Sequence, residues 1–465
     1  MLFDTSYTEE SSQVFSVSDS YNAGLNRNMD ITTKVFTRTW EMNNQKAVDP
    51  EPYVYSMENI ITGLGFHLKS ISFTGQTRRM ILPTWDEVYQ TLYDHEKFGK
   101  VIRSKIDVEE PEIKPESKLQ LAEHVYSKVK SLFTVKDGGG VFLTDKLSTI
   151  VRTQSGTASD INLVLVAALR TVNLSAEPVL VSTRDHAYPV TTYPIITSFN
   201  YVIAQVLIND MYYFLDASNP KLYFSQLPSK CYNGNAMVYS IENKTCKPVS
   251  LNANQLVDEI RRFANISVSE DLNYTCSYTE TGNEYQSFGK RVGLDGEKAK
   301  KDFITDRMNM LNLESTLISK RFSGLSNDDS LYVFSMNQKG RLPQQGDKVY
   351  LTINLNNPIA ENDFNRETRI ANIEFDSKLD LQGEIKIYIP ATLVLEELPA
   401  PRFISALTDV LFAEIVCTQM DNAMIIQYKI QVNATNFPVD AYGQVKSFFK
   451  ELNKNLKLDL VFKKN

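Results

Sequence analysis

The chain has 465 residues, of which 42% are hydrophobic and 23% charged, and its formal net charge is −7. This length is enough for roughly two to four domains, and the 24 Phe and 23 Tyr residues are enough for packed cores. Because no run of Lys and Arg is interleaved with aromatic residues, the sequence gives nucleic-acid binding no support. There is also no run of the roughly 20 apolar residues that cross a bilayer.

Cysteines and histidines give no sign of a metal site. The four histidines are scattered along the chain, and the four cysteines lack the CxxC spacing of zinc ligands. We therefore expect no metal and no cofactor, and disulfide pairing stays open. The cysteines are Cys231, Cys246, Cys276 and Cys417.

The N-terminal part of the chain, up to about residue 75, is predicted to be rich in strands. Residues 31–40 are dense in β-branched and aromatic side chains, and residues 66–73 alternate loosely between apolar and polar. Apolar residues at helical spacing predict helices over 85–98 and 117–133. The segment 107–116, which is acidic and contains two prolines, predicts a boundary that separates these two helices.

The part of the chain after residue 252 is predicted to consist mainly of short strands. A short helix is expected first, at 256–264, and helices near 297–311 and 442–456 interrupt the strands. Frequent short strands separated by turn signals favour β-sandwich modules over a parallel α/β fold. The expected strands are 274–279, 331–336, 349–355, 370–375, 384–389, 414–418 and 424–432.

Residues 152–220 contain the features that bear on function. Thr157, followed three residues later by Asp160, is similar to a capping box, in which a hydroxyl caps free N–H groups and a carboxylate suits the positive helix end. Ala158 is then the first residue of a largely apolar helix. Upstream, residues 138–140 are three glycines without the Lys and Ser/Thr of a phosphate-binding loop, so they predict a turn.

A hairpin is predicted around the turn Asn209-Asp210. If the two residues that flank this turn pair with each other, Tyr201 lies opposite Ser218. Asp216 is two residues from Ser218, so it shares the face of Tyr201 and lies diagonally from it. The register therefore predicts that Tyr201 and Asp216 can interact.

Three short motifs lie in this segment: Gly156-Thr157-Ala158-Ser159-Asp160, Phe199-Asn200-Tyr201 and Leu215-Asp216-Ala217. They resemble the Gly-Asp-Cys-x-Asp, Phe-Asn-His and Leu-Asp-Ala/Pro motifs of the transglutaminase-like branch of the papain-type thiol hydrolases. Residues 169–181 are similar to the family's helix-to-strand passage, with Asn173 where a glycine is usual, and Asn tolerates the left-handed turn conformation.

The resemblance implies an α+β fold with a central transglutaminase-like domain, a helix packed on an antiparallel sheet, flanked by β-sandwich domains. The implied domains are a partial N-terminal β-rich domain with a helical linker (1–110), the transglutaminase-like domain (111–250) and a C-terminal β-rich region (251–465). Bacterial multidomain proteins of this type are generally exported, so an extracytoplasmic or periplasmic location is implied. The first residues lack the basic region and apolar core of a secretory leader, so either Met1 is not the natural start or the protein is cytoplasmic.

Two of the three residues that carry the family's chemistry are replaced. Ala158 stands in the cysteine slot and Tyr201 in the histidine slot, and of the triad only Asp216 is retained. A phenol, with an ordinary pKa of about 10, is protonated at neutral pH and can donate a hydrogen bond but scarcely accept a proton. We therefore expect a vestigial triad without thiol chemistry.

Three functions stay open. The first is a catalytically inactive protein whose former cleft, with Thr157, Ser159, Tyr201 and Asp216, binds or scaffolds a peptide, a protein or a cell-envelope polymer. The second is a thiol-independent peptidase or acyl-transferase, in which Thr157 or Ser159 acts with His186. The third is a purely structural link between two β domains.

Overall fold

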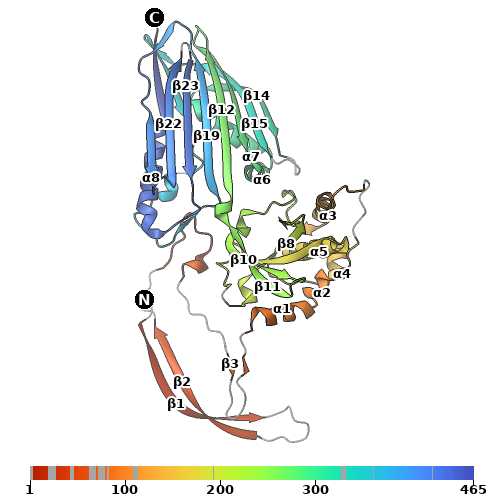
Figure 1. The fold of residues 1–465 in the computed structure, drawn as a ribbon. Coiled ribbons are helices and arrows are strands. Elements are labelled where there is room, and N and C mark those ends of the chain that lie inside the picture. Colours follow the sequence, from red (N-terminus) through yellow and green to blue (C-terminus); the bar gives the residue numbers. More distant parts are fainter. Residues whose placement is uncertain are drawn as a thin grey trace. The chain divides into compact units, whose positions relative to one another are not determined.

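The computed structural model is a mixed α+β structure in which most regular elements are strands (Figure 1). The chain divides into two compact units, Met1–Pro50 with Ile61–Gly65, and Glu51–Ile60 with Phe66–Asn465. The first unit contains one antiparallel pair, β1 (Asp4–Ser18) and β2 (Asn28–Glu41). The structure describes residues 4–18, 28–41, 47–61, 70–71, 79–80, 83–107, 114–191, 193–325, 331–359, 361–420 and 423–464.

Residues 83–256 of the second unit, the central region, place helices against a five-stranded antiparallel sheet of order β11-β10-β7-β8-β9. Helix α5 packs on β7 and β8, and α2 and α3 pack on α5. The helices are α1 (Trp85–Asp94), α2 (Gly99–Ile102), α3 (Lys118–Leu132), α4 (Leu147–Thr153) and α5 (Ala158–Thr171). The strands are β7 (Ser175–Val181), β8 (Tyr201–Ile208), β9 (Met211–Leu215), β10 (Asn233–Ser240) and β11 (Thr245–Asn252).

Helix α5 is the centre of this region, and residues 158–169 are all buried. Its sequence is apolar on every side, as expected of a helix that lies inside a core. Both hydrogen bonds of the predicted capping box, between Thr157 and Asp160, are present, so the predicted helix start is confirmed. After the helix, Asn173 has φ 61°, the left-handed conformation that was expected there.

The C-terminal region, residues 257–464, contains an eight-stranded and a four-stranded sheet that share one apolar core. The larger sheet has the order β14-β15-β13-β12-β19-β23-β22-β21, and only its central pair, β12 and β19, is parallel. The smaller has the order β16-β17-β25-β20. The larger sheet consists of β12 (Val257–Val268), β13 (Asn273–Gly282), β14 (Ser315–Ser323), β15 (Tyr332–Arg341), β19 (Lys378–Tyr388), β21 (Arg402–Ala406), β22 (Leu411–Met420) and β23 (Ala423–Val432).

The remaining elements are short strands and the helices that cover the C-terminal sheets. The smaller sheet consists of β16 (Gln344–Gln345), β17 (Lys348–Asn354), β20 (Leu393–Leu395) and β25 (Lys457–Lys464). The helices are α6 (Glu284–Gly293), α7 (Glu297–Met308) and α8 (Tyr442–Asn455). The short pairs are β3 (Ser70–Ile71) with β4 (Arg79–Met80), β5 (Thr134–Val135) with β6 (Ser155–Gly156), and β18 (Ile373–Glu374) with β24 (Asn436–Phe437).

The predicted short helix at 256–264 is wrong, because this segment is part of strand β12. Alternate residues of the strand point into the core, and Arg262 occupies one of these inward positions between Ile260 and Ala264. A charged residue at an inward position hides the two-residue period by which a strand is recognised. The charge is accommodated there because Glu280 on the neighbouring strand binds it.

Helix α1 ends at Asp94 rather than at residue 98, and α2 begins separately at Gly99. A Cβ atom built on Gly99 would collide with the carbonyl oxygens of Leu92 and Tyr93, so only glycine allows the two helices to approach this closely. Most of the strand expected at 66–73 and the centre of the boundary expected at 107–116 lie outside the described residues. The other predicted helices and the strand segment 31–40 are confirmed.

A buried ion cluster joins β12, β13 and α7 in the C-terminal region. Glu280, 1% exposed, accepts hydrogen bonds at its Oε2 from Arg262 Nε (3.0 Å), Arg307 Nε (2.8 Å) and the Tyr278 hydroxyl (3.0 Å). Lys290 Nζ lies 3.7 Å from Glu280 Oε1. Burial alone would raise the pKa of Glu280, but the charges of Arg262, Arg307 and Lys290 outweigh it and lower this pKa to about 2.

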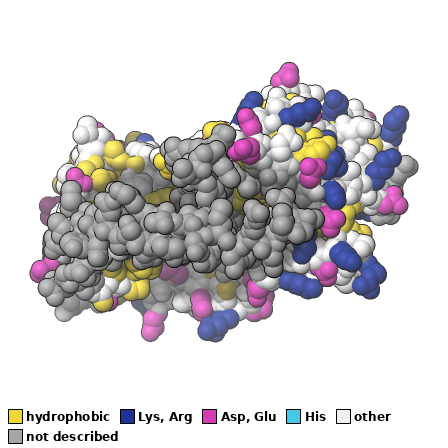
Figure 2. Space-filling model, turned by 90° about the horizontal axis from the view of Figure 1, so that it is seen from below, with side chains coloured by type: hydrophobic (Ala, Val, Ile, Leu, Met, Phe, Trp, Pro, Cys, Tyr) yellow, Lys and Arg dark blue, Asp and Glu magenta, His cyan; other side chains and the backbone are white. Residues whose placement is uncertain are grey.

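The described surface carries charges of both signs. On the described part of the face in Figure 2, Lys and Arg side chains lie among Asp and Glu side chains. Within the ranges that the structure describes, no helix combines the length and the apolar character needed to cross a bilayer.

Candidate functional site

The three candidate triad positions line one pocket of about 430 Å³ in the central region. Ala158 is the first residue of α5, Tyr201 the first residue of β8, and Asp216 directly follows β9. The positions meet because α5 packs on the strand that begins with Tyr201, and the hairpin returns the chain to Asp216. The structure therefore brings together the three positions that the sequence motifs singled out.

The hairpin β8–β9 pairs in the predicted register. Asn209 and Asp210 both have positive φ (49° and 63°), as a two-residue turn of the primed type requires. The Tyr201 hydroxyl donates to Asp216 Oδ2 at 2.7 Å and lies 2.9 Å from Ser218 Oγ. The interaction expected between Tyr201 and Asp216 is therefore present.

The Asp216 carboxylate is fully buried and is surrounded by donors. Its Oδ1 accepts hydrogen bonds from Asn162 Nδ2 (2.9 Å), from the Ser218 backbone N–H (2.9 Å) and from Ser218 Oγ (2.6 Å). With the bond from Tyr201 to Oδ2, the carboxylate has four partners. A buried charge is tolerated when its oxygens are satisfied in this way, so Asp216 anchors the hairpin whether or not a base is present.

Asn162 supports the candidate site, and the sequence reasoning missed it. It projects from α5, where it donates to Val202 O and to Asp216 Oδ1 (2.9 Å each) and accepts from the Ala217 backbone N–H (2.8 Å). One amide thereby joins the helix to both ends of the hairpin. The available signal was a single amide in the otherwise apolar run 161–169, since a fully buried amide must find polar partners.

Asp216→Asn is expected to lower the free energy of unfolding by about 1–3 kcal/mol. The Asp216 carboxylate accepts hydrogen bonds at both oxygens. The amide nitrogen of an asparagine is itself a donor, and it would face either the donating Tyr201 hydroxyl or the donors of Asn162 and Ser218. Urea denaturation at pH 7 measures the loss. Asp210→Asn, in the exposed hairpin turn, is the matched control and should change stability by less than about 0.5 kcal/mol. Equal stability of the two variants would contradict the anchoring role.

Tyr201 offers a hydrogen-bond donor and not a base. Burial, and then the charge of Asp216, raises the pKa of Tyr201 well above its usual value, so the hydroxyl keeps its proton. Lys230 Nζ lies 4.5 Å from the centre of the Tyr201 ring. The neighbouring Cys231 is buried as well, and burial followed by the charge of Asp216 raises the pKa of its thiol. A buried, protonated thiol of this kind is inert as a nucleophile.

The hydroxyls of Thr157 and Ser159 are engaged in holding the helix start. Thr157 Oγ1 accepts from the Asp160 backbone N–H (3.3 Å). Ser159 Oγ donates to Gly140 O (2.6 Å) and accepts from the Val202 backbone N–H (3.0 Å). Neither residue is among the described residues that line the pocket, although the sequence suggested both as cleft residues.

His186 lies in the loop that follows β7 and is half-buried. Its Nδ1 is 3.1 Å from Ser182 Oγ, and its backbone carbonyl accepts from Ser56 Oγ. Of this loop, Thr183 and Asp185 line the pocket, and within the described chain His186 is not part of the lining. No described hydrogen bond joins His186 to Thr157 or Ser159.

Exposed charges of both signs surround the pocket mouth, and the sequence reasoning missed them. Lys136 and Asp137 follow β5, which pairs with β6 just before α5, while Asp185 lies in the loop after β7 and Lys230 in the short 3-10 helix Ser229–Cys231 before β10. Loop residues have no periodicity that would indicate their direction, so only the fold assigns them to the pocket. Among the described residues, no group of three or more His, Cys, Asp and Glu side chains is arranged to hold a metal ion.

Comparison with known proteins gives partial similarities. Residues 347–462 match a family described as a domain of unknown function with a solved structure (DUF3858). A crystal structure described as that of a "putative protease" from Parabacteroides distasonis is similar at 13% identity and a TM-score of 0.46, over 98% of this chain and 70% of that chain. No curated protein matches the chain. The matched family covers β17 to β25, a part of the chain that does not include the pocket residues.

Proposed function

We propose that this chain is a catalytically inactive transglutaminase-like protein whose former active-site cleft binds a peptide, a protein or a cell-envelope polymer. The observation that carries the proposal is the bond of 2.7 Å from the Tyr201 hydroxyl to Asp216, in a pocket where Ala158 begins the helix. This arrangement supports retention of the cleft, while its residues offer neither a thiol nor a base. An extracytoplasmic location belongs to the same proposal and rests on the family resemblance.

The pocket lining suits a ligand with the chemistry of a peptide. Lys136 and Lys230 can bind carboxylates or carbonyl oxygens, and Asp137 and Asp185 can accept from ammonium or amide groups. Asn219 adds an amide, which matches the alternating donors and acceptors of a peptide backbone. A cell-envelope polymer with peptide branches presents the same groups.

The alternative, hydrolysis or acyl transfer by a hydroxyl, is less well supported. It requires Thr157 or Ser159 to pass its proton to a nearby base, and the sequence offers His186 for that role. The contacts of both hydroxyls with backbone atoms, and of His186 with Ser182, support capping and loop-forming roles. A purely structural link between β domains predicts that the pocket binds nothing.

Lys230→Ala is expected to weaken ligand binding about tenfold, a loss of about 1.4 kcal/mol, because the pocket loses an exposed ammonium group. The probes are a pooled tetrapeptide library and soluble glycopeptides released from cell walls. Ligands retained by the immobilised wild-type protein are identified by mass spectrometry, and their affinities are then measured by calorimetry. Lys320→Ala, an exposed lysine of β14 outside the pocket, is the matched control and should bind like wild type.

The same incubations decide between binding and chemistry. The proposal requires that a retained probe is recovered unchanged after prolonged incubation with the wild-type protein. Cleaved or cross-linked probe, with loss of the product in His186→Ala, would overturn the inactive assignment. If neither pool contains a ligand that Lys230→Ala weakens, the binding role fails and the structural link takes its place.

A further inference from the structure

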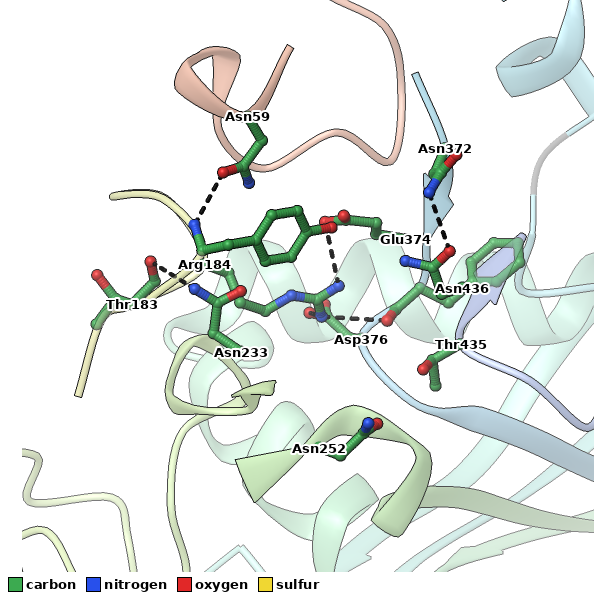
Figure 3. Close-up of polar contacts among 12 residues, drawn as sticks. Asn59, Thr183, Arg184, Asn233, Asn252, Asn372, Glu374, Asp376, Thr435 and Asn436 are labelled. Carbon is green, nitrogen blue, oxygen red and sulfur yellow. Dashed lines mark hydrogen bonds and ion pairs between the residues drawn. The ribbon is translucent and has the colours of Figure 1, made fainter. Parts of the chain in front are cut away.

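The loop of residues 182–188 forms a wall of the pocket and also reaches the C-terminal region. Thr183 and Asp185 line the pocket, and the Arg184 side chain between them extends toward residues 374–376 (Figure 3). Arg184 is only 5% exposed, so a charged side chain has been buried between two regions of the second unit. A buried guanidinium is costly unless its donors are satisfied. The contacts that satisfy it therefore determine where the loop lies.

These contacts come from residues far from the pocket in sequence. Arg184 Nη1 donates to Phe375 O and to Asp376 Oδ1, both at 3.1 Å, and Nη2 lies 3.9 Å from Glu374 Oε2. The guanidinium carbon lies 3.7 Å from the centre of the Tyr55 ring. Desolvation, and then proximity to Asp376, raises the pKa of Tyr55, so its ring stays neutral beneath the cation. The C-terminal region and residues 51–60 together hold the Arg184 side chain.

The backbone of the same loop is joined to the pocket. The Arg184 N–H donates to Lys230 O at 2.9 Å, and the Lys230 ammonium lies over the Tyr201 ring. Thr183 is bonded twice to Asn200, the residue before Tyr201, through its N–H (2.9 Å) and its hydroxyl (2.8 Å). A continuous set of contacts therefore runs from Asp376 through the loop around Arg184 to Lys230 and Asn200, which line the pocket beside Tyr201.

The far end of the loop is fixed in a similar way. Asn233 Nδ2 donates to Ala187 O (2.7 Å) and Ser182 O (3.1 Å), which closes the loop on itself. Tyr188 N donates to Asn59 Oδ1 at 2.8 Å. Both ends of the loop are held by neutral hydrogen bonds. A change in the C-terminal region would therefore alter the position of the pocket wall through the ion pairs of Arg184.

From these contacts we infer that Arg184 couples the pocket to the C-terminal region, so that residues 374–376 control the position of the pocket wall. While Asp376 and Phe375 O bind the Arg184 guanidinium, Thr183 and Asp185 stay in place. When the guanidinium is released, Thr183 and Asp185 become more mobile. By linkage, a ligand that needs the ordered wall strengthens the hold of residues 374–376 on Arg184 by the same factor. The nature of that ligand rests on the proposed function, whereas the coupling itself does not.

The test places a reporter thiol in the pocket through Ala158→Cys and measures its rate of modification by N-ethylmaleimide, with peptide mass spectrometry to locate the label. Adding Arg184→Met, which keeps an apolar chain over Tyr55 but removes the charge and the donors, should raise this rate about tenfold. Adding Asp376→Asn, which changes a residue whose side chain is 48% exposed, should raise it about threefold. Arg321→Met, at an exposed arginine of β14, is the control and should leave the rate unchanged.

Three buried native cysteines away from the pocket, Cys246, Cys276 and Cys417, report whether a variant has unfolded, because they are labelled only if the cores open. Faster labelling at position 158 with the native cysteines protected supports the coupling. Rates within twofold of the control in both Arg184→Met and Asp376→Asn would overturn it. If Arg184→Met opens the cores, Asp376→Asn alone decides. No ligand enters this assay, so a pocket that binds no peptide would defeat the proposed function and leave this result standing.

Discussion

Introducing the thiol and the imidazole that the proposed family has at these positions, by Ala158→Cys together with Tyr201→His, is expected to yield a thiol that iodoacetamide alkylates at pH 7 about 10 to 100 times faster than the thiol of Ala158→Cys alone. Position 158 is the first residue of α5, and the positive end of a helix lowers a thiol pKa. An imidazole at position 201 would face the same pocket and could be oriented by Asp216, as a base is held by its carboxylate. The alkylation rate at position 158, followed by mass spectrometry from pH 5 to 9, measures the effect.

The matched control for this prediction is Ala158→Cys with Tyr201→Phe, which removes the Tyr201 hydroxyl without supplying a base. It should react no faster than Ala158→Cys. A pH profile with an added inflection near 6 to 7 is expected only in the variant with the imidazole. If the two double variants react equally, positions 158 and 201 do not face each other as the resemblance implies, and the vestigial-triad assignment is contradicted.

Glu280→Ala is expected to lower the free energy of unfolding by about 3–5 kcal/mol, the largest effect on stability that we predict. It leaves the buried guanidinium groups of Arg262 and Arg307 without the carboxylate that both now bind. Equilibrium denaturation with urea at pH 7 measures the loss. The control is Glu297→Ala on α7, where the carboxylate is exposed and pairs with Lys300, and its cost should be below about 1 kcal/mol.

The lowered pKa of Glu280 also determines how the free energy of unfolding depends on pH. Because its pKa is lowered to about 2 in the folded protein, from 4.5, its stabilisation is complete above pH 4.5 and is lost as the pH falls toward 2. The shift corresponds to about 3 kcal/mol. Wild type should therefore lose about this much more stability between pH 5 and 2 than Glu280→Ala does. Parallel pH profiles of the two proteins would contradict the role assigned to Glu280.

Local sequence signals predicted the parts of the structure that depend on near neighbours in the chain. The hydroxyl and carboxylate of Thr157 and Asp160 indicated the start of α5, and the turn Asn209-Asp210 set the register that places Tyr201 beside Asp216. Both rest on contacts within a few residues or within one hairpin. The domain boundaries at 110 and 250 are not tested by these contacts and stay predictions.

Long-range pairing accounts for the features that the sequence did not reveal. Arg262 resembled a helix residue because its partner, Glu280, is 18 positions away on another strand. The position of Arg184 depends on Phe375 and Asp376, nearly two hundred residues later in the chain. No local pattern records such partners, because a buried charge is stabilised by whatever the fold brings to it.

By itself, the sequence determined which residues occupy the candidate triad positions, and with them the absence of a thiol at Ala158 and of a base at Tyr201. Only the tertiary structure decided that these positions share a pocket with Lys230 and Asp185, and that Arg184 connects its wall to the C-terminal region. The physical reason is that side-chain chemistry is a property of each residue, whereas burial and pairing are properties of the packed chain.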